Sequence, residues 1–245
     1  MMSRYFVEVG YMGKQYAGFQ VQQNANTVQA EVEKALMIYF KTAFQLTGSS
    51  RTDAGVHAFQ NYFHFDFDTE TVYNWPNVVY HLNAILPADI VIRDIRQVNE
   101  TAHCRFDAVS RTYQYSLYRF KDPFLNDRAY YYPYKLDISL LNEAASLVKA
   151  ASDFEAFAKR NSQVHTYLCT INESDWIEEG NMIRYQVNGN RFLRGMVRGL
   201  VGTMLRVGNK KISLDEFAAI IESRDSTRVD FSVPAHGLTL TSVLY

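Results

Sequence analysis

The sequence contains few residues that could form disulfides or bind metal ions. Its only two cysteines, Cys104 and Cys169, are far apart, and no Cys-x-x-Cys pair occurs. The six histidines do not fall into a spaced ligand set. We therefore expect neither a disulfide framework nor a zinc site, and no structural metal.

Two other kinds of segment are missing. No apolar run reaches membrane-spanning length, and the N-terminus lacks a basic, apolar, small-residue leader, so a cytoplasmic enzyme is the default expectation. There is no G-x-x-x-x-G-K-[ST] loop and no G-x-G-x-x-G after a strand. These are the motifs that bind nucleotide cofactors, and their absence agrees with a reaction that uses no cofactor.

An excess of positive charge is also missing. The formal net charge is −1, whereas nucleic-acid-binding domains usually leave a basic footprint. The basic residues nevertheless cluster, at Arg191, Arg194, Arg198, Arg206, Lys210 and Lys211. Acidic residues gather elsewhere, at Glu173, Asp175, Glu178 and Glu179. This uneven distribution allows a basic cleft within a neutral total, so any nucleic acid would be bound locally.

Hydrophobic periodicity predicts an α+β protein large enough for one large or two small domains. In the first half we expect strands at 5–9, 43–46 and 59–67, the last with one buried face, a helix capped by Thr27 and a helix over 74–86. The first half should end with a strand at 90–98, and in the second half we expect strands at 104–120, 166–176, 182–187 and 238–245, a helix from Asp137 and two further helices. The halves share a coarse order, which predicts a duplicated unit divided into residues 1–103 and 104–245.

The most informative stretch is Arg51-Thr52-Asp53-Ala54-Gly55-Val56-His57-Ala58, a polar turn between two predicted strands. Loops held by a rigid scaffold are where catalytic groups concentrate, and this one presents a single carboxylate, Asp53. The alternative is an ordinary turn in which Arg51 forms a surface ion pair with Asp53. The short pattern Arg-x-Asp-x-Gly does not decide between the two.

A second informative stretch is a helix predicted from Arg191 to Val207. Its apolar residues form one broad arc, and the opposite arc carries arginines together with Gly195, Gly199 and Gly202. Each interior glycine should cost roughly 0.5–1 kcal/mol relative to alanine, so a compensating contact is expected. Either another backbone packs closely on the glycines, or a nucleic-acid backbone or the Asp53 loop approaches them, and the two explanations are compatible.

The octet resembles the signature loop of the TruA family of tRNA pseudouridine synthases, and further matches follow in the same order along the chain. They are Tyr11-x-Gly13-x-x-Tyr16-x-Gly18-x-Gln20-x-Gln22, Thr27-Val28-Gln29, His103-x-Arg105-Phe106, Arg111-x-Tyr113-x-Tyr115, Phe192-Leu193-Arg194-x-Met196-Val197-Arg198 and Gly237-Leu238. The resemblance implies two ferredoxin-like halves that share a mixed, mostly antiparallel sheet with helices on one side and an RNA-binding cleft in the centre. It also implies that a homodimer isomerises uridine to pseudouridine at positions 38, 39 or 40 of the tRNA anticodon arm, with no cofactor or metal.

The resemblance also implies roles for particular residues. Asp53 is the catalytic aspartate, Tyr113 the active-site tyrosine and Arg198 the arginine facing Asp53, with Arg194 as the second choice. Arg51 helps to hold the target nucleotide out of its stack, and Leu238 packs on the uracil. The other expected substrate-binding residues are Arg191, Arg206 and His57. Each of three residues also has a purely structural interpretation. Tyr113 would be an ordinary strand tyrosine, Leu238 a core leucine, and His57 a residue that supports its loop.

Several points stay open at this level. Asp53 could act as nucleophile or as base. Met12 and Ser50 stand where the family usually has Asp and Gly. Neither touches the proposed carboxylate, and the expectation for Met12 is altered contacts near the first loop and, with them, an altered choice of RNA. Two other functions compete: an RNA-binding module without catalysis, and a nucleoside glycosidase, which usually needs a second catalytic carboxylate.

Overall fold

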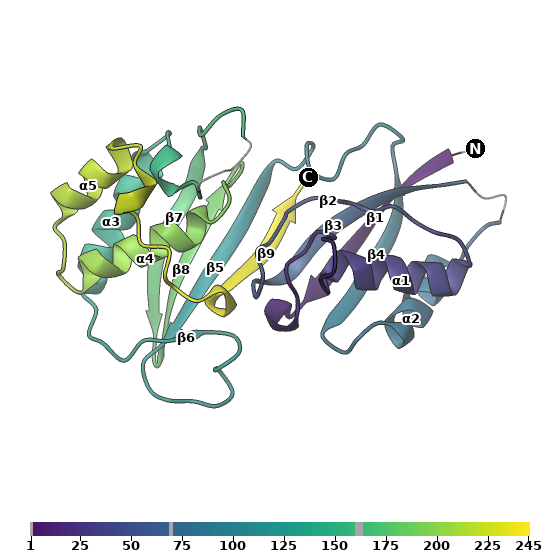
Figure 1. Cartoon of the computed structure of the whole chain (residues 1–245), viewed down its shortest axis with the longest axis horizontal. Coiled ribbons are helices and arrows are strands. Elements are labelled where there is room, and N and C mark those ends of the chain that lie inside the picture. Colours follow the sequence, from purple (N-terminus) through teal and green to yellow (C-terminus); the bar gives the residue numbers. More distant parts are fainter. Residues whose placement is uncertain (1, 69–70, 160–163) are drawn as a thin grey trace. The chain divides into compact units, whose positions relative to one another are not determined.

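The computed structural model describes residues 2–68, 71–159 and 164–245. The chain forms two compact units (Figure 1). The first contains the residues up to Val109 together with Leu240–Tyr245, and the second contains Ser110–Thr239. Strand β9 (Leu238–Leu244) therefore begins in the second unit and ends in the first.

The first unit is built on an antiparallel sheet. Its long strands are β1 (Met2–Tyr11), β3 (His57–Asp68) and β4 (Ile90–Val98), in the order β4-β1-β3. The two-residue strand β2 (Thr47–Gly48) pairs with β3, and β9 also neighbours β3. The predicted strands at 5–9, 59–67 and 90–98 are thereby confirmed.

Helices α1 (Val28–Phe40) and α2 (Trp75–Ile85) complete the first unit and lie beside each other (Figure 1). Each begins at a capping residue whose side chain accepts a backbone hydrogen bond. Thr27 accepts from the Ala30 amide at the start of α1, and Asn74 accepts from the Asn77 amide at the start of α2. Such caps satisfy amide groups that the first helical turn leaves unpaired. Both predicted helices are confirmed.

Strand β3 is buried on both faces, not on one as predicted. Every residue from Asn61 to Phe65 is buried. On the second face, the ring of Tyr245 lies 5.2 Å from that of Phe6 and 5.1 Å from that of Tyr62. A residue 180 positions away in the chain covers this face, so period-two alternation within the strand could not reveal it.

The second unit contains the strands β5 (Ser110–Tyr118), β8 (Met182–Gly189) and β7 (Ile171–Glu179), which pair in that order and are antiparallel. The short strand β6 (Tyr130–Tyr131) runs parallel to β5, so the fold is α+β with a mixed, mostly antiparallel sheet. The predicted strand 182–187 is confirmed.

Three helices accompany this sheet: α3 (Ile138–Ala150), α4 (Met196–Gly208) and α5 (Leu214–Glu222). They lie together at the β7 and β8 side of the unit (Figure 1), with α3 packed on β7 and on both other helices. The helix predicted from Asp137 is confirmed, and Asp137 caps it by accepting from the Leu140 amide. Short 3-10 turns occur at Gly13–Gln15, Glu155–Phe157, Ser226–Arg228 and Ala235–Gly237.

Three predicted strands have other boundaries. Residues 43–46 form no strand, and pairing begins only at Thr47. Residues 104–109 form turns before β5, and residues 166–170 precede β7 with a single isolated bridge at Leu168. In all three cases the predicted strand begins several residues before the first residue that pairs with another strand. Residue composition alone therefore overestimates the length of the paired segment.

Among the described residues, no helix combines the length and apolar character needed to cross a membrane. Cys104 and Cys169 are both buried, and neither forms a disulfide with the other. No group of three or more His, Cys, Asp or Glu side chains in the described ranges is placed to hold a metal ion.

Candidate active site

Asp53 lies in a tight turn directly before β3. The amide of Val56 donates to the Asp53 carbonyl at 3.1 Å, and Gly55 closes the turn with φ of +82°. Only glycine adopts such a conformation without strain. The Asp53 side chain is half-buried, Arg51 is exposed and Val56 is buried. The turn therefore anchors its far end in the core while Asp53 keeps access to solvent.

A preceding loop, residues 12–19, holds this turn from outside. A Cβ on Gly13 would lie 1.9 Å from the Val56 carbonyl oxygen, and the Gly13 amide donates to Nδ1 of His57 at 2.9 Å. Gly18 has φ of +115°, and its Cβ position lies 3.1 Å from the Thr52 carbonyl oxygen. The two glycines in this family motif thus allow backbone to pack on backbone.

His57 is only 3% exposed and accepts from this loop, so its role in supporting the loop is confirmed. Gln29 has a similar role. Its backbone amide donates to the Phe19 carbonyl at 2.9 Å, and its side-chain amide donates to the Leu46 carbonyl at 2.8 Å. Much of the signature outside the octet therefore serves to hold the Asp53 turn.

Asn61 is the hub of this support, and sequence reasoning missed it. Its side-chain amide donates to the Ser50 carbonyl at 2.8 Å and to the Tyr11 hydroxyl at 3.1 Å. Its Oδ1 accepts from the Ser50 amide at 3.3 Å, and the hydroxyls of Tyr11 and Thr52 share a hydrogen bond of 2.8 Å. Asn61 is completely buried. The available signal was a polar residue at a core-facing position of a strand, which a satisfied network permits.

The two departures from the family pattern both lie in this support. Met12 is half-buried, and its amide donates to the Asp89 carbonyl at 2.9 Å, a bond that does not depend on its side chain. Ser50 is 6% exposed, and its Oγ is buried without a hydrogen-bond partner. Neither substitution removes a bond that holds the turn.

In the second unit, helix α4 begins at Met196 rather than at Arg191 as predicted. Gly195 has φ of +74° at the N-cap, which ends the preceding segment and places Arg191 and Arg194 outside the helix. Every residue of α4 is buried except Arg198 and Arg206, which are half-buried. The arc that carries the glycines is therefore covered.

The cover is an extended segment, residues 228–233, which we call the strap. A Cβ on Gly202 would lie 2.2 Å from the Asp230 carbonyl oxygen, and one on Gly199 would lie 2.7 Å from the Phe231 ring. The Thr203 hydroxyl accepts from the Asp230 amide at 3.1 Å. Close packing of another backbone, one of the two explanations for these glycines, is confirmed for Gly202, whereas Gly199 and Gly195 meet side chains.

Arg198 binds the strap directly. Its Nε donates to the Val233 carbonyl at 2.9 Å, and its Nη2 donates to the carbonyls of Val233 at 2.6 Å and Phe231 at 3.3 Å. Near the other end of α4, Arg206 donates to the Arg228 carbonyl at 3.4 Å. The guanidinium of Arg198 is thus held in a fixed orientation by backbone oxygens.

The strap continues to Leu238 through a contact with β5. The Tyr115 hydroxyl donates to the Pro234 carbonyl at 2.7 Å, and a Cβ on Gly237 would lie 2.5 Å from the Tyr115 ring. Leu238 follows and is 6% exposed. Burial raises the pKa of Tyr115 far above its ordinary value, although the charge of Arg198 opposes this shift. Tyr115 therefore acts as a neutral packing residue.

Tyr113 lies on β5 beside the segment that precedes α4. It is 9% exposed, and its ring meets that of Phe192 edge-on, with centroids 5.2 Å apart. Arg111 donates to the Asn190 carbonyl at 2.9 Å. The second unit thus brings together β5, the segment with half-buried Arg191 and exposed Arg194, and the strap.

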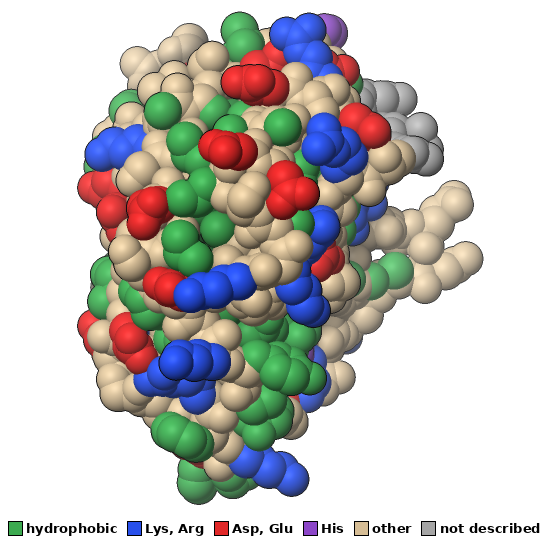
Figure 2. Space-filling model, turned by 90° about the vertical axis from the view of Figure 1, so that its left-hand side faces the viewer, with side chains coloured by type: hydrophobic (Ala, Val, Ile, Leu, Met, Phe, Trp, Pro, Cys, Tyr) green, Lys and Arg blue, Asp and Glu red, His purple; other side chains and the backbone are tan. Residues whose placement is uncertain are grey.

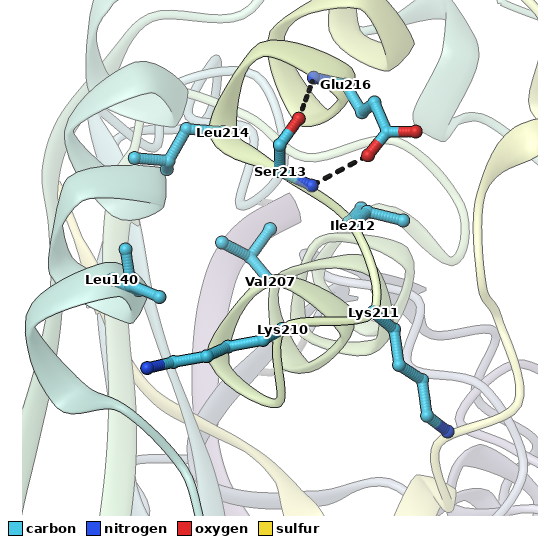
Figure 3. Close-up of a pocket in the computed structure, with 8 residues that line it drawn as sticks. All are labelled: Leu140, Val207, Lys210, Lys211, Ile212, Ser213, Leu214 and Glu216. Carbon is cyan, nitrogen blue, oxygen red and sulfur yellow. Dashed lines mark hydrogen bonds between the residues drawn. The ribbon is translucent and has the colours of Figure 1, made fainter.

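The outer face of the second unit, which carries α3 and α5, has mixed charge. Figure 2 shows basic and acidic side chains interspersed with hydrophobic ones there. A pocket of about 360 Å³ lies between α3 and the start of α5 (Figure 3). Leu140, Val207, Ile212 and Leu214 surround it, and the Ser213–Glu216 capping box forms its rim. None of the sequence-predicted site residues lines this pocket.

These features define an α+β protein that presents one carboxylate from a tightly held turn and carries an arginine-bearing helix locked under a strap. The family model for tRNA pseudouridine synthases matches residues 9–107 and 144–245. The chain belongs to this family.

Curated relatives agree over the full length. A tRNA pseudouridine synthase A from Parabacteroides distasonis is 41% identical over 244 residues, covering 100% of this chain and 96% of the relative. The enzyme of the same name from Porphyromonas gingivalis is also 41% identical, covering 100% and 98%. One from Staphylococcus saprophyticus is 38% identical, covering 98% and 90%.

Proposed function

We propose that this chain isomerises uridine to pseudouridine in the anticodon stem-loop of tRNA, at positions 38, 39 or 40, without a cofactor or metal. The observation that carries this proposal is the Asp53 turn, because the loop motifs characteristic of the family hold it in place through Gly13, Gly18 and His57. The relatives' shared name supports the substrate.

We propose further that the two halves, residues 1–103 and 104–245, are ferredoxin-like and enclose a central RNA-binding cleft. The element order supports this. The first half runs β1-α1-β2-β3-α2-β4, and the second runs β5-β6-α3-β7-β8-α4-α5-β9, which has the same order once the two-residue strand β6 and helix α5 are set aside. The order β-α-β-β-α-β is that of the ferredoxin-like fold.

Asp53 is the reacting carboxylate in this proposal. Isomerisation breaks the C–N glycosidic bond, turns the base and joins it through carbon, and a single carboxylate can serve as nucleophile or as base. Arg198 would favour the charged form of Asp53 and orient it. Its rigid attachment to the strap supports that role, and Arg194 is the second candidate.

The remaining roles concern the substrate. Tyr113 would stack on the target base or relay a proton, and Leu238 would pack on the uracil. Arg51 would hold the extruded nucleotide, since extrusion costs a few kcal/mol. Arg191 and Arg206 would bind phosphate. For His57, which is buried, contact with the substrate stays a prediction.

We also propose a cytoplasmic homodimer in which one tRNA contacts both subunits. A nearly neutral chain gains a larger RNA-binding surface in this way. Sedimentation at micromolar concentration should give a dimer. A fully active monomer would refute this part.

The decisive experiment is incubation with an unmodified tRNA transcript, followed by measurement of pseudouridine and of free uracil. We expect pseudouridine at one or more of positions 38–40. Unchanged uridine with intact tRNA binding would indicate the RNA-binding module without catalysis. Released uracil would indicate the glycosidase.

A further inference from the structure

The turn His103–Asp107 of the first unit is built almost entirely by local hydrogen bonds. Nδ1 of His103 accepts from the amides of Arg105 at 3.2 Å and Phe106 at 3.4 Å. The Asp107 carboxylate accepts from the His103 amide at 2.8 Å, and the Asp107 amide donates to the His103 carbonyl at 3.0 Å. These bonds fix the direction of the side chains at 105 and 106.

The inner side of the turn is anchored to the sheet. Cys104 is completely buried, its amide donates to Nδ1 of His64 at 3.3 Å, and its Sγ lies 3.1 Å from the Thr47 carbonyl oxygen. The Tyr245 hydroxyl donates to the Cys104 carbonyl at 2.6 Å. Three separate segments of the first unit therefore hold one residue of this turn.

The outer side presents an aromatic ring next to a cation. Phe106 is 73% exposed, its ring lies 4.2 Å from that of His103, and the Arg105 guanidinium lies 5.6 Å from the centroid of Phe106. A rigid turn that leaves a phenylalanine in water forgoes roughly 1.5–3 kcal/mol of burial. Exposed aromatics beside arginine suit unstacked RNA bases, because the ring stacks on the base and the cation meets the phosphate.

We propose that Phe106 is a stacking platform for an unpaired base of the tRNA and that Arg105 binds the adjacent phosphate. This inference rests on the proposed function for its ligand, although not on the role of Asp53. The position is a binding site and takes no part in the chemistry. It extends the RNA-contacting residues to a turn whose motif had no assigned role.

The test compares Phe106→Ala, Phe106→Tyr and Phe106→Trp with wild type for binding an unmodified tRNA transcript and for single-turnover pseudouridine formation. Phe106→Ala should weaken binding about five- to hundredfold, the range for loss of one base–aromatic stack. Phe106→Tyr should stay within about twofold. Turnover at saturating tRNA should be unchanged in all three variants. Emission from the indole introduced by Phe106→Trp should be quenched when tRNA binds.

A matched control is Tyr80→Ala, an aromatic on α2 that is 71% exposed and whose ring meets that of His81 edge-on, with centroids 5.4 Å apart. It should bind tRNA as wild type does. Arg105→Gln should lower the slope of log affinity against log salt by about one phosphate contact. Thermal melts should show all variants folded, because the altered side chains are exposed.

Each outcome separates the inference from the proposed function. Wild-type binding by Phe106→Ala, with pseudouridine still formed, overturns the inference and leaves the function intact. Dissociation of a dimer by Phe106→Ala, with unchanged tRNA affinity per subunit, also overturns it and assigns the ring to a second copy. Weakened binding by Phe106→Ala in a protein that forms no pseudouridine supports the platform while the proposed function fails.

Discussion

The Asp53 turn and helix α4 both rely on glycines packed against backbone, yet they hold their charged groups differently. Around Asp53, the supporting bonds come from other side chains, chiefly Asn61 and His57. In α4, the supporting bonds come from Arg198 itself, which binds the strap through two of its nitrogens.

This difference determines how the two regions respond to substitution. Around Asp53, the proposed reacting group and the supporting bonds belong to separate residues, so its side chain can be changed while the turn persists. In Arg198 the proposed partner of Asp53 is also the residue that binds the strap, so its replacement removes a positive charge and also releases the strap. Substitutions can therefore separate the two contributions only in the first region.

The largest effect is expected from Asp53→Asn. The amide is nearly isosteric but cannot act as nucleophile or base, so isomerisation should be abolished while tRNA affinity stays within about a few-fold. Single-turnover assays and tRNA binding measure the two quantities. Asp175→Asn, at an exposed position of β7, is the control and should keep full activity. Retained turnover in Asp53→Asn would refute the site.

The next effect compares Arg198→Met with Arg206→Met. Arg198→Met should lower turnover at saturating tRNA by about a hundredfold or more, with little change in binding, because the carboxylate loses its oriented partner. Arg206→Met should weaken all tRNAs alike and lower the salt dependence by about one contact, with turnover kept.

Single-turnover kinetics and binding at two or more salt concentrations distinguish these two variants. A melting curve of Arg198→Met shows how much of its effect comes from the released strap. If Arg198→Met affects binding alone, the partner of Asp53 must be sought elsewhere, and Arg194 is the next residue to replace.

Local signals predicted the elements well where they depend on neighbours in sequence. The caps at Thr27 and Asp137 begin helices as expected, because capping is a bond within four residues. The family motifs likewise located the Asp53 turn. These predictions needed no knowledge of contacts between residues far apart in the sequence.

The errors have a common cause in long-range packing. The start of α4 depends on the φ of Gly195, whose Cβ position lies 2.9 Å from the Lys159 side chain. The second buried face of β3 depends on Tyr245, and the role of Asn61 on Ser50 and Tyr11. Neither hydrophobic periodicity nor composition contains these pairings.

A smaller effect separates two glycines of α4. Gly202→Ala places a Cβ 2.2 Å from a backbone oxygen, whereas Gly199→Ala meets side chains of Phe231 and Val229 that can shift. Alanine gains roughly 0.5–1 kcal/mol of helix propensity in both. Gly199→Ala should therefore be close to neutral, and Gly202→Ala should lose about 1–3 kcal/mol. Denaturant unfolding measures both, and equal losses would contradict a backbone contact.

The smallest effect concerns acid and the first unit. Burial, with help from nearby positive charge, lowers the pKa of His64 from 6.5 to about 4. The unfolded chain therefore takes up a proton near pH 6.5 that the folded chain refuses until about pH 4. The free energy of unfolding should fall as pH decreases through this window. The charged or titratable groups around His64 are Arg4, His103, Asp66, Asp107 and Cys104.

His64→Gln should flatten this slope between pH 6.5 and 4.5, and melting temperatures across that range provide the measurement. An unchanged slope in His64→Gln would mean that another group takes up the proton.

Strand β9 has a consequence for synthesis on the ribosome. Residues 240–245 complete the first unit, but 130 residues of the second unit, Ser110–Thr239, are translated before them. At a translation rate of about 5–20 residues per second, synthesis of these residues takes roughly 7–26 s, and the first unit lacks its last strand for that time. During that interval Tyr245 does not yet cover its face of β3. The nascent chain is then a natural client for chaperones that bind exposed aromatic surface.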